Sequence, residues 1–211
     1  MKNILFLISS FALLLSCNSN DDDITEQQVD NTSFYALKVG NTWNYKHYDY
    51  NADTEEFIDT GISEQVEITG KETIYNDEYF VIKTTTVGND NTLNYFPDNG
   101  VKITYNRVYE YSLVAETNRL IFYTNNFDET MLAFSDGYFS KINPEALIRS
   151  VNAGDFNCLE MDIYRKNDAG EIIGNRSKRY YSDGIGLINT ISIRPTQNRL
   201  TEKRLESYSI Q

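Results

Sequence analysis

Short runs rich in Tyr, Phe, Ile, Val and Thr follow one another along most of this chain. In several runs apolar and polar residues alternate with a period of two, as Val66 and Ile68 do with Gln65 and Glu67. Alternation of this kind is typical of strands with one buried face and one wet face. The pattern predicts strands over residues 43–50, 62–69, 78–87, 101–105, 107–114, 120–124, 158–165, 178–182, 187–194 and 200–210.

Turn-forming residues separate these runs. Gly, Asn and Asp, which tolerate the backbone angles of tight turns, cluster at 39–41, 69–70, 75–77, 98–100, 168–170 and 183–186. Closely spaced turns between short strands predict hairpins, so we expect an all-β fold built as an antiparallel meander. The pattern leaves open whether the meander forms a curved sheet, a sandwich or an open barrel.

One short segment has the features of a helix start. Asn143 suits the N-cap position, Pro144 suits the first turn, and Glu145 follows it. We therefore expect one short helix over Asn143–Ile148 beside the strands.

The first seventeen residues have the pattern of a secretory signal. The basic residue Lys2 precedes an apolar run from Ile4 to Leu15, and the small residue Ser16 is followed by Cys17. The run is shorter than the roughly 20 apolar residues of a membrane-spanning helix. The order Leu-Leu-Ser-Cys resembles the bacterial lipobox. This resemblance implies cleavage after Ser16 and a diacylglycerol on Cys17.

A polar segment, residues 18–33, follows the cysteine and has almost no apolar content. Such a segment cannot bury enough surface to offset its ordering entropy, so we expect a disordered tether. Its acidic residues Asp21, Asp22 and Asp23 resemble the export signal of surface lipoproteins in the Bacteroidetes, with a solvated spacer as the alternative. The chain then divides into a signal peptide (1–16), a lipidated cysteine with its acidic tether (17–33) and a single all-β domain (34–211).

Charge and cysteine content narrow the possible partners. The chain has 31 acidic and 19 basic residues and a formal net charge of −12, so nucleic acid and anionic lipid head groups are poor partners for its surface. Lipid on Cys17 leaves Cys158 without an intramolecular partner, which excludes a disulfide framework. The remaining length suits one domain and can bury a full core.

Three further blocks of sequence resemble those of uncharacterised β-rich bacterial lipoproteins. They are residues 34–45, with Ala36 where proline is usual, residues 153–158 and residues 180–188. The resemblance implies an all-β, membrane-anchored envelope protein and carries no activity with it. Within the first block we expect Trp43, the only tryptophan, to anchor the first strand in the core.

The sequence contains no recognisable catalytic or cofactor motif. We find no phosphate-binding loop, dinucleotide fingerprint, HExxH zinc motif or GxSxG motif. The lone histidine, His47, and Cys158 are explained as ordinary strand residues. We therefore assign no catalytic, cofactor-binding or metal-binding residue, and expect neither a cofactor nor enzyme activity.

These observations lead to three hypotheses for function. The first is an outer-membrane lipoprotein, exposed at the cell surface or alternatively facing the periplasm, that acts as a non-enzymatic binding or structural module for an envelope protein or an extracellular glycan. The second is a carrier that holds an apolar ligand within a curved sheet or barrel. The third is a hydrolase. A dry apolar cavity would favour the carrier, and an exposed row of aromatic rings would favour a glycan or protein partner.

Replacement of Cys17 tests the lipid anchor. We expect the Cys17→Ala variant to lose membrane association, because the lipid is attached through the thiol sulfur, and to keep its folded body. Membrane fractionation and circular dichroism of the soluble protein measure the two effects. Ser19→Ala is the control and should remain with the membranes. A Cys17→Ala protein that also remained there would contradict the anchor.

Overall fold

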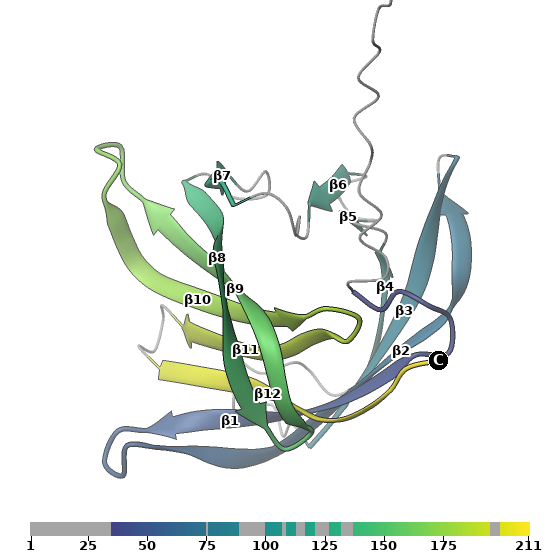
Figure 1. Ribbon diagram of the computed structural model, residues 1–211, viewed down its shortest axis with the longest axis horizontal. Coiled ribbons are helices and arrows are strands. Elements are labelled where there is room, and N and C mark those ends of the chain that lie inside the picture. The colour runs from purple at the N-terminus through teal and green to yellow at the C-terminus, as the bar shows by residue number, and fades with distance from the viewer. Residues whose placement is uncertain are drawn as a thin grey trace, which may run out of the picture.

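The computed structural model describes residues 35–74, 76–88, 100–106, 109–112, 117–120, 127–131, 137–194 and 199–211. These residues form one antiparallel sheet of twelve strands, which curls into an open half-barrel (Figure 1). The strands are β1 (Thr42–Asn51), β2 (Glu56–Ile74), β3 (Asp77–Val87), β4 (Gly100–Asn106), β5 (Tyr109–Ser112), β6 (Thr117–Leu120), β7 (Thr130–Met131), β8 (Tyr138–Val151), β9 (Gly154–Lys166), β10 (Ile172–Ser182), β11 (Gly186–Arg194) and β12 (Arg199–Ser209).

The first and last strands lie side by side in the middle of the sheet. The strand order is β6-β5-β4-β3-β2-β1-β12-β11-β10-β9-β8-β7. Two meanders, β1–β6 and β7–β12, are therefore joined where β1 pairs with β12, with Thr42 opposite Ser209. The backbone N–H of Gln211 donates to Oδ1 of Asn41 at 2.9 Å, which fixes the second residue after β12 beside the start of β1. The expected meander is confirmed, as a curved sheet.

The concave side of the sheet, called the inner face below, is lined by aromatic and aliphatic side chains. Nε1 of Trp43 on β1 donates to the carbonyl oxygen of Ile185 at 2.7 Å. The hydroxyl of Tyr45, also on β1, donates to the carbonyl oxygen of Leu187 at 2.9 Å. Both hydrogen bonds cross over β12 to the start of β11. Curling of the sheet brings β1 close enough to β11 for these bonds to form. Trp43 is 5% exposed, so its predicted role as a core anchor is confirmed.

The tip of the β8–β9 hairpin packs on the opposite side, called the outer face, where the two strands cross β11 and β12 (Figure 1). The guanidinium of Arg149 on β8 lies 4.2 Å from the ring centre of Tyr180 and donates to Oδ1 of Asn189 at 2.8 Å. It also lies 3.7 Å from the carboxylate of Glu202. The core cluster comprises residues of the sheet, including this hairpin, and one residue of the segment before β1: Ala36, Trp43, Tyr45, Ile68, Ile82, Phe156, Cys158, Tyr180, Ile188 and Leu205.

The prediction of a helix over Asn143–Ile148 is wrong, because these residues lie within β8. The pairing of β8 with β9 is interrupted between Asn143 and Leu147, so the residues between them form a bulge. Oδ1 of Asn143 does accept a hydrogen bond from the backbone N–H of Glu145 at 3.1 Å. This cap-like contact stabilises the bulge instead of a helix. The bulge also accommodates Pro144, which has no N–H to donate to a neighbouring strand.

Most of the other predicted strands are confirmed, and several are longer than expected. The predicted strand 62–69 is the middle of the 19-residue β2. The described part of the predicted strand 107–114 is β5, and the predicted strand 120–124 lies outside the described residues except for Leu120. The hydrophobic pattern did not predict β7, β8 or, apart from Leu120, β6.

Gly88, which follows β3, is a position where we expect alanine to be poorly tolerated. Its φ is +94°, and a Cβ there would overlap the carbonyl oxygen of Gly61 in β2. Gly184 also has a positive φ, +71°, but has open space around it. We expect Gly88→Ala to lower the free energy of unfolding by about 3 kcal/mol and Gly184→Ala by about 1 kcal/mol, because only Gly88 adds steric overlap to backbone strain. Urea unfolding measures both, and equal losses would contradict the close approach.

Candidate functional site

An open pocket of about 240 Å³ lies on the inner face. Among the described residues, β1, β2, β3, β10, β11, β12 and the segment before β1 contribute to its wall. The lining residues are Tyr35, Leu37, Trp43, Tyr45, Glu64, Val66, Ile68, Ile82, Thr84, Tyr181, Gly186, Leu187 and Lys203. Strands as far apart in the sheet as β3 and β10 share this pocket because the sheet curls.

Most of the pocket wall is apolar. On β2, Val66 and Ile68 face the pocket because alternate residues of a strand point to the same side. On β1, the polar atoms of Trp43 and Tyr45 are already bonded to backbone carbonyls. The two rings therefore present mainly their carbon atoms to the pocket, and this part of the wall suits an apolar ligand.

The segment before β1 closes one side of the pocket. The rings of Tyr35 and Tyr181 meet edge to face, with 5.7 Å between their centres. A Cβ at Gly186 would lie 3.1 Å from the carbonyl oxygen of Tyr35, so glycine at this position lets the segment lie close to the start of β11. Burial, followed by the neighbouring Tyr181, raises the pKa of Tyr35. The hydroxyl of Tyr35 is therefore protonated at neutral pH.

A buried ion pair forms the polar side of the pocket. Oε1 of Glu64 on β2 accepts a hydrogen bond from Nζ of Lys203 on β12 at 3.0 Å. Oε2 of the same carboxylate lies 3.3 Å from Nε2 of His47 on β1. The side chain of Glu64 is 8% exposed and that of Lys203 is 23% exposed. The ammonium also lies 4.7 Å from the ring centre of Tyr45, within the range of a cation–π interaction.

Two opposing effects set the pKa of Glu64. Burial raises the pKa, because it disfavours the charged carboxylate. The charge of Lys203, together with hydrogen bonds from His47 and Lys203, outweighs burial and lowers the pKa to about 2. Glu64 is therefore a carboxylate at every physiological pH, and the polar side of the pocket carries a negative and a positive charge side by side.

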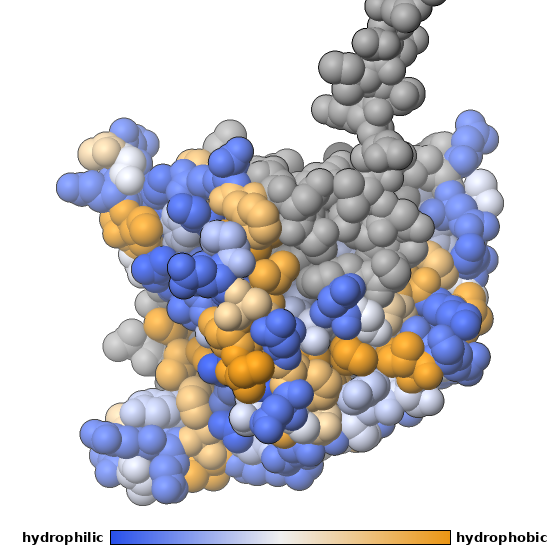
Figure 2. All heavy atoms as spheres, viewed as in Figure 1, coloured by the Kyte–Doolittle hydropathy of each residue, from blue (hydrophilic) through white to orange (hydrophobic). Residues whose placement is uncertain are grey.

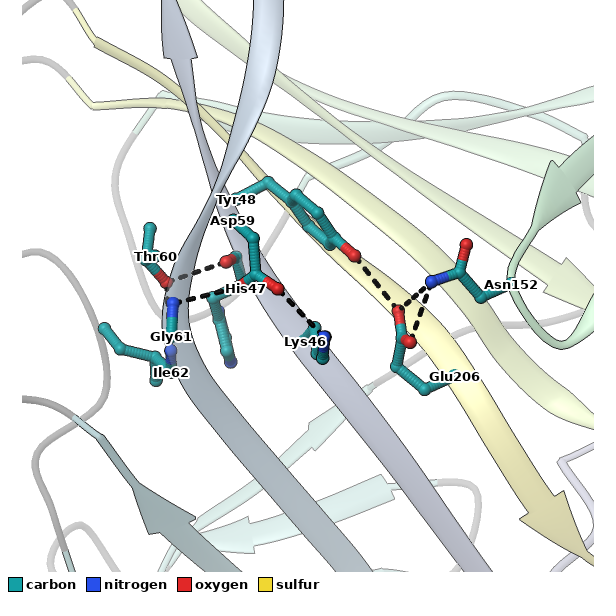
Figure 3. Close-up of polar contacts among 9 residues, drawn as sticks. All are labelled: Lys46, His47, Tyr48, Asp59, Thr60, Gly61, Ile62, Asn152 and Glu206. Carbon is teal, nitrogen blue, oxygen red and sulfur yellow. Dashed lines mark hydrogen bonds and ion pairs between the residues drawn. The ribbon is translucent and has the colours of Figure 1, made fainter.

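A bulge between β1 and β2 sets the position of His47 (Figure 3). The register of the two strands shifts between Lys46 and Tyr48. Oγ1 of Thr60 donates to the carbonyl oxygen of His47 at 2.7 Å, which ties the two strands together at the bulge. Lys46 pairs with Asp59 at 2.9 Å beside it. The backbone around His47 is thus held by β2, while its ring contacts the buried carboxylate.

The groups at this site suit non-covalent binding. Cys158 lies on β9 in the buried core and is not among the lining residues, and burial raises the pKa of its thiol to about 11, with a smaller opposing effect of Arg149, so this thiol is not a nucleophile at neutral pH. Within the part of the chain that the structure describes, no group of three or more His, Cys, Asp or Glu side chains could hold a metal ion. What the pocket offers is an apolar wall with one ion pair at its side.

The residues predicted as sites lie outside the described residues: Cys17, Asp21, Asp22 and Asp23. The structure adds two functional candidates that sequence reasoning missed, Glu64 and Lys203. A signal for Glu64 was present, because it occupies the same strand face as the apolar residues Val66 and Ile68. No helix in the described part of the chain is long and apolar enough to cross a membrane.

No protein-family model and no curated protein matches this chain. Among solved structures, a protein described as a lipoprotein from Parabacteroides distasonis has 16% sequence identity and a TM-score of 0.47, covering 83% of this chain and 98% of its own. A protein from Bacteroides fragilis, described as exported and with a YmcC-like fold, has 10% identity and a TM-score of 0.47, covering 82% and 96%. At these values the likenesses carry no inference about ligand or partner.

Replacement of Glu64 by glutamine tests the contribution of the buried carboxylate to stability. Its pKa is about 2 in the folded protein against an ordinary value of 4.5. The charged form therefore stabilises the fold above pH 4.5, and this contribution is lost as the pH falls toward 2. The difference corresponds to about 3 kcal/mol. We expect the free energy of unfolding of Glu64→Gln to be lower than that of the wild type by about 3 kcal/mol at pH 7. The two values should become similar near pH 2.

Urea unfolding between pH 2 and pH 7 measures this convergence. Glu145→Gln, at an exposed position of the β8 bulge, is the control and should follow the wild type over the whole range. Parallel curves for Glu64→Gln and the wild type would mean that the pKa of Glu64 is not lowered by folding.

Proposed function

We propose that this chain is a non-enzymatic lipoprotein of the bacterial outer membrane whose half-barrel binds a ligand in the inner-face pocket. In this proposal residues 1–16 are removed as a signal peptide and Cys17 carries the lipid. Residues 17–33 link the anchor to the domain. The observation that supports ligand binding is the pocket itself, because it combines a largely apolar wall with one localised polar group.

The composition of the pocket wall supports this function over the alternatives. Ligand sites are concave and mostly apolar, with a few polar groups that fix orientation. The inner-face pocket has aromatic and aliphatic side chains from five strands and the ion pair Glu64–Lys203. The pocket is open and is not a dry closed cavity, but its largely apolar wall supports the carrier hypothesis, in which an apolar part of the ligand is sheltered by the curled sheet.

A partner at the outside of the domain, such as an envelope protein or a glycan, is less well supported. An exposed row of aromatic rings would favour it. Among the residues whose side chains the structure describes, the large exposed aromatic rings are Phe127, which precedes β7, and Tyr208 on β12, and these two do not form a row. Figure 2 shows one side of the molecule, on which hydrophobic residues are interspersed with hydrophilic ones. A hydrolase has the least support at the inner-face pocket, because Glu64 is the one carboxylate among the described residues that line it.

The location of the protein follows from the proposed anchor. Asp21, Asp22 and Asp23 directly follow the lipidated cysteine, and this position supports display at the cell surface, with a periplasm-facing domain as the alternative. The segment from Cys17 to Tyr35 spans at most about 65 Å when fully extended. The domain can therefore work either close to the membrane or well away from it.

Filling the pocket tests the proposed binding site. We use toluene as a small apolar probe and follow the methyl NMR signals of the protein. Toluene should shift the signals of Leu37, Val66, Ile68 and Ile82 and leave that of the exposed Ile148 unchanged. Val66→Phe should weaken toluene binding by about tenfold or more, because the larger ring occupies the pocket.

Ile172→Phe is the matched control, since Ile172 is exposed on β10 and does not line the pocket. This variant should bind toluene as the wild type does. Shifts spread over surface methyl groups, or equal binding by the wild type and a folded Val66→Phe variant, would contradict the pocket as a ligand site.

A further inference from the structure

The polar side of the pocket points to a specific kind of ligand, and this inference rests on the proposed function of the pocket. We infer that the site selects a small uncharged amphipathic molecule that carries a hydroxyl group, which bridges Glu64 and Lys203. The apolar part of the ligand lies against the aromatic and aliphatic wall. Three properties of the site lead to this ligand: its size, its hydrogen-bonding capacity and its balance of charge.

The size of the pocket limits the apolar part of the ligand. The volume is about 240 Å³, below the range of about 300–1,000 Å³ that is usual for drug-sized ligands. A cavity of about 150 Å³ is enough for one benzene molecule. The pocket therefore suits a single substituted ring or an alkyl chain of about eight carbons, and a lipid with long acyl chains would extend far beyond it.

The ion pair leaves hydrogen-bonding capacity directed at the pocket. The ammonium of Lys203 has three N–H donors, and its hydrogen bond to Glu64, at 3.0 Å, uses one of them. A carboxylate has about four lone-pair sites, and the Glu64 carboxylate contacts Lys203 and His47. Since both Glu64 and Lys203 line the pocket, a ligand there can meet a donor and an acceptor together. A hydroxyl group can accept from Lys203 and donate to Glu64 with the same oxygen.

The charge balance of the pair disfavours a charged ligand. A carboxylate bound to a second N–H of Lys203 would lie roughly 5 Å from the Glu64 carboxylate, because both would accept from one ammonium. An ammonium bound to Glu64 would be held at a similar distance from Lys203. Each arrangement places two like charges in a partly buried site with one opposite charge between them. The net charge of −12 on the chain opposes an anionic ligand further.

Three probes of eight carbons each, with different polar groups, test this inference. They are 1-octanol, octanoate and octylamine, each titrated at pH 7 into the full domain. Trp43 is the only tryptophan of the chain and lines the pocket, so its fluorescence reports binding. We expect 1-octanol to bind about tenfold or more tightly than either charged probe.

Two variants show whether the ion pair is the cause of this selectivity. Lys203→Met removes the ammonium and leaves Glu64, so octylamine should overtake 1-octanol as the tightest of the three probes. Lys46→Met removes an ammonium from the exposed pair with Asp59, outside the pocket. This variant should leave the ranking of the three probes by affinity unchanged. Circular dichroism confirms that each variant is folded. The ranking of the three probes by affinity for the wild type is a separate test, which holds even if a variant fails to fold.

The possible outcomes separate this inference from the proposed function. Tightest binding of octanoate or octylamine to the wild type would overturn the inference, while the pocket would remain a ligand site. An unchanged order of probes in a folded Lys203→Met variant would also overturn it, because the ion pair would then not select the ligand. If none of the three probes and no toluene bound to the wild type, both the inference and the proposed pocket function would be wrong.

Discussion

The two edge strands of the sheet follow one another in the chain, and this constraint forces the sheet to curl. Twelve strands spaced about 4.8 Å apart would make a flat sheet roughly 50 Å wide. β6 ends at Leu120 and β7 begins at Thr130, so the connection between the two edges reaches at most about 36 Å. A flat sheet with this strand order cannot exist. The inner face, and with it the pocket, follows from the order of the strands.

The contact between β1 and β12 makes this curled sheet a single body. It joins two meanders whose paired residues are far apart in sequence, Thr42 with Ser209, so forming it requires closure of a long loop. Trp43 and Tyr45 strengthen the junction by bonding across β12 to the start of β11. A register shift lies in the same place, between Asn44 and Tyr45, and such bulges increase the twist and bend of a strand.

Much of the fold can be predicted from local pattern, because alternation and turn residues are local properties. β8 could not, since its bulge carries Asn143, Pro144 and Glu145, which together resemble a helix start, and its pairing with β9 decides the outcome. The pairing of β1 with β12 also lies beyond local reasoning, because nothing near either strand identifies its partner. Glu64 and Lys203 are 139 residues apart, so their ion pair is visible only once that topology is known.

The ion pair is the feature of the inner face that packing alone does not explain. Two charges taken from water are stabilising only when they are well paired, and apolar side chains of similar size often serve stability as well or better. Glu64 is held by Lys203 and His47, so the carboxylate is well paired, while the ammonium keeps donors on the pocket side. An open half-barrel leaves this polar group within reach of a molecule entering from solvent, which a filled core would not. The combination of an apolar wall with an accessible donor and acceptor is thus better suited to recognition than to stability.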